Sequence, residues 1–359
     1  MLEAELDSLI PTSLADFPSI EAVQQHYKSL LGEQRGDKSR KGKTAAIRGL
    51  IVAGAPVNGV DRDGATPLYL AAKHGHPSAV RYLLSVNASP DIPKADHTPL
   101  HIAAQNGHAE IVALLLTVPI DINRQAIDGV TPLSIAARMG HASVIRHLLD
   151  AHADVNQARS DGVPPLFIAA KHGHLKVVQE LLTCPHIDLD QRRNDTVTPL
   201  FIASRKGRHE IVSNLLEAGA EVNLPCIDGA TPLFVASMKS QVEVVEILLR
   251  HSASVNLTRN DGTSPLHAAC EKGNGIICRI LLEAGASASV SRNNGSTALF
   301  IAADNGRANV VQQLLALRGH NTLDIDNHRG ITAIHRAVDK GHEQVVRLLL
   351  KAGCNEDFG

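Results

Sequence analysis

The side chains that most readily suggest chemistry in this sequence are its 19 histidines and five cysteines. Both residue types bind zinc or act in catalysis, but only where several of them meet at one point. The cysteines follow no metal-ligand spacing. Ten of the histidines occupy fixed positions of a recurring phrase, which spreads them along the chain instead of gathering them round one ion. We therefore expect structural hydrogen bonds from the histidines, and we predict no catalytic residues, no cofactor and no metal site.

The recurring phrase is Thr-Pro-Leu or a close variant, followed by a short apolar stretch. Its copies begin at Thr66, Thr98, Thr131, Pro164, Thr198, Thr231, Ser264, Thr297 and Thr332. A period near 33 residues that carries this phrase is typical of stacked helix pairs. From about Lys43 to the C-terminus the sequence resembles the ankyrin-repeat family. The resemblance implies an all-α fold, an ankyrin-repeat solenoid of about nine full helix-pair repeats.

One repeat shows why the phrase begins a helix. Thr98 is a suitable N-cap, because its hydroxyl can accept a hydrogen bond from a free amide of the first turn. Pro99 follows at the first helical position, where its missing N–H costs nothing, and Gly107 can end the helix in a left-handed conformation. A second helix is expected from about Ala109. Only neighbouring repeats can cover the apolar face of such a pair, so we expect a curved solenoid with first helices and turns on its concave side.

The N-terminal part of the chain lies outside the full repeats. We expect residues 1–43 to form a helical extension with a basic linker, and residues 44–359 to form the solenoid. The expected parts, in order, are two short helices at Leu2–Ile10 and Ser19–Leu31, a polar linker at Gly32–Lys43 and a half-repeat at Thr44–Asn58. The extension either caps the apolar end of the solenoid, which we favour, or acts as a docking or delivery segment.

Some repeats depart from the glycine pattern. Asp96 and Thr196 replace a turn glycine, Ser240 replaces the glycine that ends a first helix, and Arg318–Asp326 lengthens one turn. A positive φ costs more for a residue other than glycine. We therefore expect locally altered turns at these places.

Composition restricts the class of partner. The net charge of −2 predicts neither nucleic-acid nor membrane binding, and no apolar run is long enough to span a membrane. An odd number of cysteines and an acidic N-terminus indicate reduced thiols and no secretory signal. We expect a monomer in the cytoplasm, with the nucleus as the alternative compartment and the host cytosol if the chain is a secreted effector.

In the ankyrin-repeat family, partners usually bind the concave side through turn tips and the two residues before the helix-ending glycine. The resemblance therefore implies a protein-binding site at Arg138, Met139, Arg159, Lys171, His172, Arg193, Arg205, Lys206, Met238 and Lys239. These positions predict a basic middle of the groove that attracts an acidic partner. Alternatively, aspartates near the turn arginines cancel the field and leave an ordinary solvated face.

One column of aromatic residues follows the Thr-Pro-Leu phrase. It holds Tyr69, Phe167, Phe201, Phe234 and Phe300. Helical spacing places this column near the core between repeats, so we favour packing over a row of aromatic rings that faces a ligand.

The sequence thus predicts a non-enzymatic scaffold that binds another protein, with an acidic surface, in the concave groove. The alternative is a targeting or regulatory adaptor, for example a pathogen effector acting in a host cell, whose activity also needs the N-terminal extension. Neither alternative includes a nucleic-acid or membrane partner.

Overall fold

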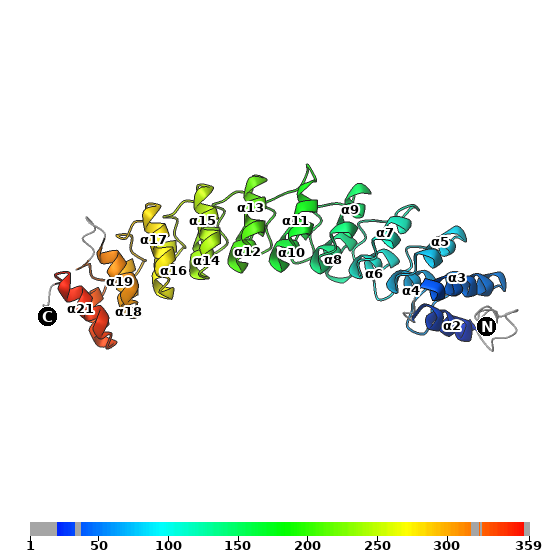
Figure 1. Cartoon of the computed structure of the whole chain (residues 1–359), viewed down its shortest axis with the longest axis horizontal. Helices are drawn as coiled ribbons and strands as arrows, with labels where there is room; N and C mark the ends of the chain where they lie inside the picture. The colour runs from blue at the N-terminus through cyan, green and yellow to red at the C-terminus, as the bar shows by residue number, and fades with distance from the viewer. Residues whose placement is uncertain (1–19, 33–36, 317–322, 324, 355–359) are drawn as a thin grey trace. The chain divides into compact units, whose positions relative to one another are not determined.

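The structure, a computed structural model, describes residues 20–32, 37–316, 323 and 325–354. All regular secondary structure in these ranges is helical, and the helices come in pairs along the chain (Figure 1). The predicted helix at Leu2–Ile10 and most of the lengthened turn at Arg318–Asp326 lie outside the described residues.

Each full repeat contributes a first helix and a second helix. The first helices are α4 (Pro67–Lys73), α6 (Pro99–Gln105), α8 (Pro132–Met139), α10 (Pro165–His172), α12 (Pro199–Lys206), α14 (Pro232–Met238), α16 (Pro265–Lys272), α18 (Ala298–Asp304) and α20 (Ala333–Asp339). The second helices are α5 (Pro77–Ser85), α7 (Ala109–Leu115), α9 (Ala142–Asp150), α11 (Leu175–Leu182), α13 (His209–Glu217), α15 (Val242–Arg250), α17 (Gly275–Glu283), α19 (Ala308–Leu315) and α21 (Glu343–Lys351). The predicted all-α stack of nine helix pairs is confirmed.

The chain forms two compact units, residues 1–187 and residues 188–359. In the first unit, α4, α6, α8 and α10 pack side by side in one row, and α5, α7, α9 and α11 form a second row. The second unit has the same arrangement from α12 to α21. Each repeat therefore buries its apolar face on its neighbours within the unit.

The first helices begin as the sequence predicts. Thr98 has an extended backbone, and its Oγ1 accepts a hydrogen bond from the His101 amide. The same cap recurs in later repeats, for example from the Phe201 amide to Thr198 Oγ1 at 3.2 Å. Gly107 takes a φ of 73° after α6. The predicted cap, first-position proline and left-handed glycine are thus present.

The aromatic column belongs to the core. The rings of Phe167, Phe201, Phe234 and Phe300 are all buried, as is that of Tyr69. Small residues such as Ala103 and Ala104, which are fully buried, let neighbouring first helices approach closely. The interpretation of this column as packing is confirmed, although some of the rings also form the floor of surface hollows described below.

The N-terminal region corrects two expectations. α3 (Asp37–Val52) begins before Lys43, so residues 37–43 continue a helix and do not form a linker. An acid at the first turn and a run free of proline favour this earlier start. α2 (Ile20–Gly32) packs on α4 while α3 packs on α5. The N-terminal segment is therefore a helix pair that stacks like a repeat, not the half-repeat at Thr44–Asn58 that the sequence predicts.

α2 covers the end of the stack. Val23 and Tyr27 are 2% and 1% exposed, and Leu30 is also buried. Lys28 forms an ion pair with Asp63 at the tip of the first full repeat. These contacts support the cap interpretation for α2.

Two of the irregular turns keep the regular conformation, contrary to expectation. Thr196 has a φ of 64° and its amide donates to the Arg193 carbonyl, as Gly162 does to Arg159 one repeat earlier. Ser240 likewise has a φ of 58°. The flanking hydrogen bonds hold these residues in a conformation that costs them roughly 1–2 kcal/mol. The turn at Asp96 does differ, because Ala95 and Asp96 both take positive φ between paired Lys94 and His97.

Candidate protein-binding face

The candidate site lies on the surface formed by the first helices and the turns that precede them, which we call the first-helix face. In the first unit, Arg138 and Met139 end α8 and Lys171 and His172 end α10. All four side chains are exposed, and Met139 is 45% exposed. The His172 ring stacks on that of His174, 6.0 Å away. Because α8 and α10 pack side by side, two cations and one apolar side chain share one end of this face.

In the second unit, Arg205 and Lys206 end α12, while Met238 ends α14 and Lys239 follows it as the C-cap. Lys206 and Lys239 are exposed, and Arg205 and Met238 are half-buried. α12 and α14 also pack side by side. The structure thus places the predicted helix-end residues together within each unit.

Five cations at the helix ends have no acidic partner among the residues that the structure describes. No carboxylate among the residues that the structure describes lies within 4.0 Å of the charged atoms of Arg138, Lys171, Arg205, Lys206 or Lys239. Each of these positive charges is therefore available to a partner, and it is screened only by solvent and salt.

The arginines at the turn tips are in a different situation. Arg159 Nε lies 3.7 Å from Asp161 Oδ1, and Arg193 forms a two-point ion pair with Asp195. The hydrogen bond from Arg193 lowers the pKa of Asp195, so this carboxylate is ionised at neutral pH. At the turn tips, the aspartates therefore cancel the positive charge as the alternative interpretation expects.

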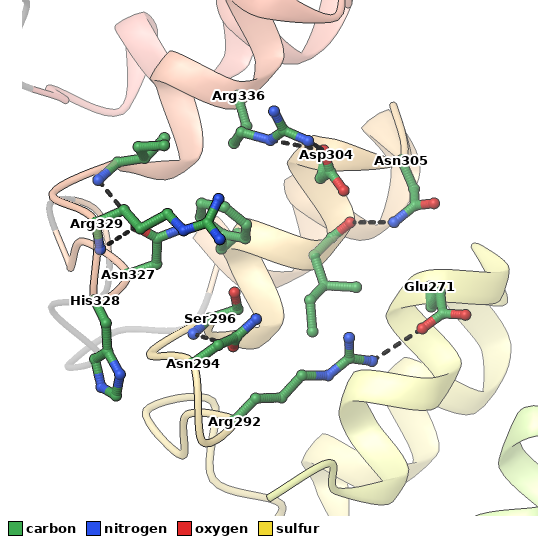
Figure 2. Close-up of a pocket in the computed structure, with 13 residues that line it drawn as sticks. Glu271, Arg292, Asn294, Ser296, Asp304, Asn305, Asn327, His328, Arg329 and Arg336 are labelled. Carbon is green, nitrogen blue, oxygen red and sulfur yellow. Dashed lines mark hydrogen bonds and ion pairs between the residues drawn. The ribbon is translucent and has the colours of Figure 1, made fainter. Parts of the chain in front are cut away.

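The C-terminal repeats contain a polar hollow of about 590 Å³, shown in Figure 2. Arg292 reaches Glu271 at 2.9 Å, and Arg336 reaches Asp304 at 2.6 Å. Acids at the helix ends are thus already engaged by arginines of the next repeats. This part of the face is polar with mixed charge.

A second hollow of about 410 Å³ lies in the second unit, next to the helix-end cations. Phe201 and Phe234 form its floor, and Met238 and Arg205 lie at its wall. Ile227, at the tip of a turn, is 73% exposed beside it. Sequence reasoning missed this hollow, since periodicity places the two phenylalanines in the core and does not show which turn residue covers them.

The histidines have the structural role that the sequence predicts. Those after the helix-ending glycine reach back one repeat, as when Nε2 of His108 and of His174 lie 3.2 and 3.0 Å from the carbonyl oxygens of Lys73 and Arg138. His101 accepts from the Thr98 amide at Nδ1 and donates from Nε2 to the Val130 carbonyl. In the described part of the chain, no group of three or more histidine, cysteine or acidic side chains could hold a metal ion.

A sequence model of ankyrin repeats, described as three copies, matches residues 38–126, 89–159, 133–226, 200–292 and 285–358. The chain therefore belongs to the ankyrin-repeat family, whose repeats generally bind other proteins and are typically not enzymes. The ankyrin repeat domain of human ASB11, known from a crystal structure, is similar to this chain with a TM-score of 0.52. The two are 29% identical, over 57% of this chain and 92% of that one. No curated protein was found to match the sequence.

Proposed function

We propose that this chain is a non-enzymatic scaffold that binds an acidic surface of another protein through the helix ends of the first-helix face. One observation carries the proposal: within the described part of the chain these helix-end cations have no acidic partner, whereas the turn-tip arginines Arg159 and Arg193 do. An exposed cation whose neighbour already neutralises it contributes little to steering, but an unpaired one raises the association rate of an acidic partner.

The contact set has a polar and an apolar part. Arg138, Lys171, Arg205, Lys206 and Lys239 supply charge, and Met139 and Met238 supply adaptable apolar contacts. The first helices are rigid because their cores are packed before binding. Little conformational entropy is therefore lost on association, which favours affinity.

The adaptor alternative gains no support from α2, which is built into the stack and does not form a free docking helix. The described residues contain no helix that could cross a lipid bilayer. We also propose a cytoplasmic monomer, in keeping with Cys270 and Cys278, whose sulfur atoms lie 3.8 Å apart as thiols and form no disulfide.

A paired pull-down with quantitative mass spectrometry tests the proposal. The baits are the intact chain and a variant with Arg138, Lys171, Arg205 and Lys206 changed to Glu. The control bait carries Lys176→Glu and Lys351→Glu, which change exposed lysines on second helices. All baits are checked for helical content by circular dichroism.

We expect proteins with acidic surfaces to be captured by the intact chain and by the control, and lost with the four-residue variant. Addition of salt should release the same proteins, because the attraction is electrostatic. Equal capture by all three baits would contradict the assignment of binding to the helix ends.

A further inference from the structure

Arg259 shows how a turn-tip arginine covers the aromatic ring of the preceding repeat. It lies five residues before Ser264, at the tip of its turn. Its guanidinium carbon lies 5.5 Å from the centre of the Phe234 ring, and Asp228 holds it there at 2.7 Å. The long arginine side chain therefore covers part of the Phe234 ring and lines one side of the hollow of about 410 Å³.

The corresponding position one repeat earlier is Cys226, five residues before Thr231. A cysteine side chain is too short to extend over the ring of the preceding repeat as Arg259 does. The hollow of about 410 Å³ opens at this place, over Phe201 and Phe234. We call it the Cys226 pocket. The exchange of one arginine for a cysteine thus accounts for an opening between two repeats that otherwise follow the same pattern.

The wall of the pocket is apolar toward Met238 and Ile227. A side chain such as Ile227, 73% exposed at the tip of a turn, leaves apolar surface in water until a partner covers it. An occupant that buries Phe201, Met238 and Ile227 must itself be apolar, because a buried polar group without a hydrogen bond is costly.

The charges at the rim favour an acidic occupant. Asp195 is paired with Arg193, and Asp228 accepts from Arg259 and lies 3.0 Å from the Cys226 sulfur. Each of these two carboxylates therefore already has an arginine partner, although Arg259 is shared with Asp261, 3.5 Å away. Arg205, which also lines the pocket, has no carboxylate of a described residue within 4.0 Å. It is the rim charge left to attract a ligand.

We propose that the Cys226 pocket receives a bulky apolar side chain, such as leucine or phenylalanine, from an acidic segment of the partner protein, with a carboxylate beside that side chain paired to Arg205. This inference rests on the proposed function and makes it more specific. The helix-end cations attract the acidic segment, and the pocket selects segments that carry an apolar anchor. Burial of such an anchor strengthens binding roughly 10- to 100-fold.

The test uses the full chain and short synthetic fluorescent peptides measured by anisotropy. One peptide set has a central leucine or phenylalanine between acidic residues. A second set has alanine at the centre, and a third keeps the apolar centre but carries lysines in place of the acids. The proposal predicts that the first set binds about tenfold or more tightly than the second, and that the third set does not bind.

Cys226→Arg restores the residue type found at this position in the neighbouring repeats and fills the pocket. We expect it to remove the advantage of the apolar centre. Ala126→Arg is the matched control, since Ala126 occupies the same turn position in the first unit and is also a small residue. It should leave peptide affinity unchanged. Ile227→Asp, at an exposed site that does not threaten folding, should weaken binding even if Cys226→Arg proves unstable.

Equal affinity for leucine and alanine peptides, or full retention of the advantage in both pocket variants, would overturn the pocket assignment. If the apolar centre gave no advantage but acidic peptides still bound, and lost affinity with Arg205→Glu and Lys206→Glu, the pocket inference would fail while the proposed function would stand. Binding of the lysine peptides in preference to the acidic ones would overturn both.

Discussion

The buried histidines of the helix caps predict that the fold weakens in mild acid. His101 and His267 are both fully buried. Burial lowers the pKa of each ring from the usual value of 6.5 to about 4. In His267, Nδ1 accepts a hydrogen bond from the Ser264 amide at 3.0 Å. Protonation would replace this acceptor with a donor, so the cap requires the neutral ring.

The direction of the effect follows from proton binding. Between pH 6.5 and pH 4 the unfolded chain takes up a proton at each of these histidines and the folded chain does not. The free energy of unfolding therefore falls as the pH falls through this window. With an unfolded pKa of 6.5 and a folded pKa of about 4, each ring lowers the stability by about 2 kcal/mol at pH 5 relative to neutral pH.

The measurement is urea denaturation at pH 7.5 and pH 5, followed by circular dichroism. His267→Phe removes the titrating ring, and phenylalanine occupies the same position of the repeat at Phe201 and Phe300. This variant should lose about 2 kcal/mol less than the intact chain between the two pH values. His209→Asn removes an exposed histidine and should behave as the intact chain does. The reasoning is refuted if His267→Phe and the intact chain lose the same stability.

Three stability predictions follow from the fold, each measured by urea denaturation. Thr196→Gly should stabilise the chain by about 0.5–1 kcal/mol, because glycine takes the positive φ without the strain of a β-branched residue. The greater conformational entropy of glycine in the unfolded chain offsets only part of this gain, so a destabilised variant would contradict the observed turn. Tyr27→Ala in α2 should cost about 3–5 kcal/mol, since the ring is 1% exposed, and no change would show that α2 does not cap the stack. Phe201→Ala should cost a similar amount at 5% exposure, and a loss below about 1 kcal/mol would mean that the ring is not packed.

Most of the fold could be predicted from the sequence because one local signal recurs. Thr98 and Pro99 specify a helix start by their own chemistry, and the same residues begin most later repeats. The N-terminal helix pair, α2 and α3, is harder to predict from the sequence. Residues 37–43 contain charged and small residues without the repeat phrase, so composition indicates a linker, yet packing of α3 on α5 extends the helix.

The candidate site could be predicted only in part. The repeat pattern gives the positions at the helix ends, since each pair precedes a helix-ending glycine or, for Met238 and Lys239, the Ser240 that replaces it. It does not show which cations are paired, because the contact between Arg193 and Asp195 depends on the path of the turn. The Cys226 pocket exists because this repeat has a cysteine where the next repeat has Arg259. The sequence shows the exchange, but only the position of Arg259 over the Phe234 ring shows what the exchange uncovers.

The central claim is that unpaired helix-end cations, and not turn-tip arginines, bind an acidic partner. The most direct measurement is isothermal titration of a partner identified by the pull-down against two neutralised variants. One variant carries Arg138→Gln and Lys171→Gln. The other removes both partners of each turn-tip ion pair, with Arg159→Gln, Asp161→Asn, Arg193→Gln and Asp195→Asn. We expect the first variant to lose about tenfold or more in affinity and the second to lose little, because removal of a balanced pair leaves the local net charge unchanged. Equal losses, or a larger loss in the turn-tip variant, would contradict the account.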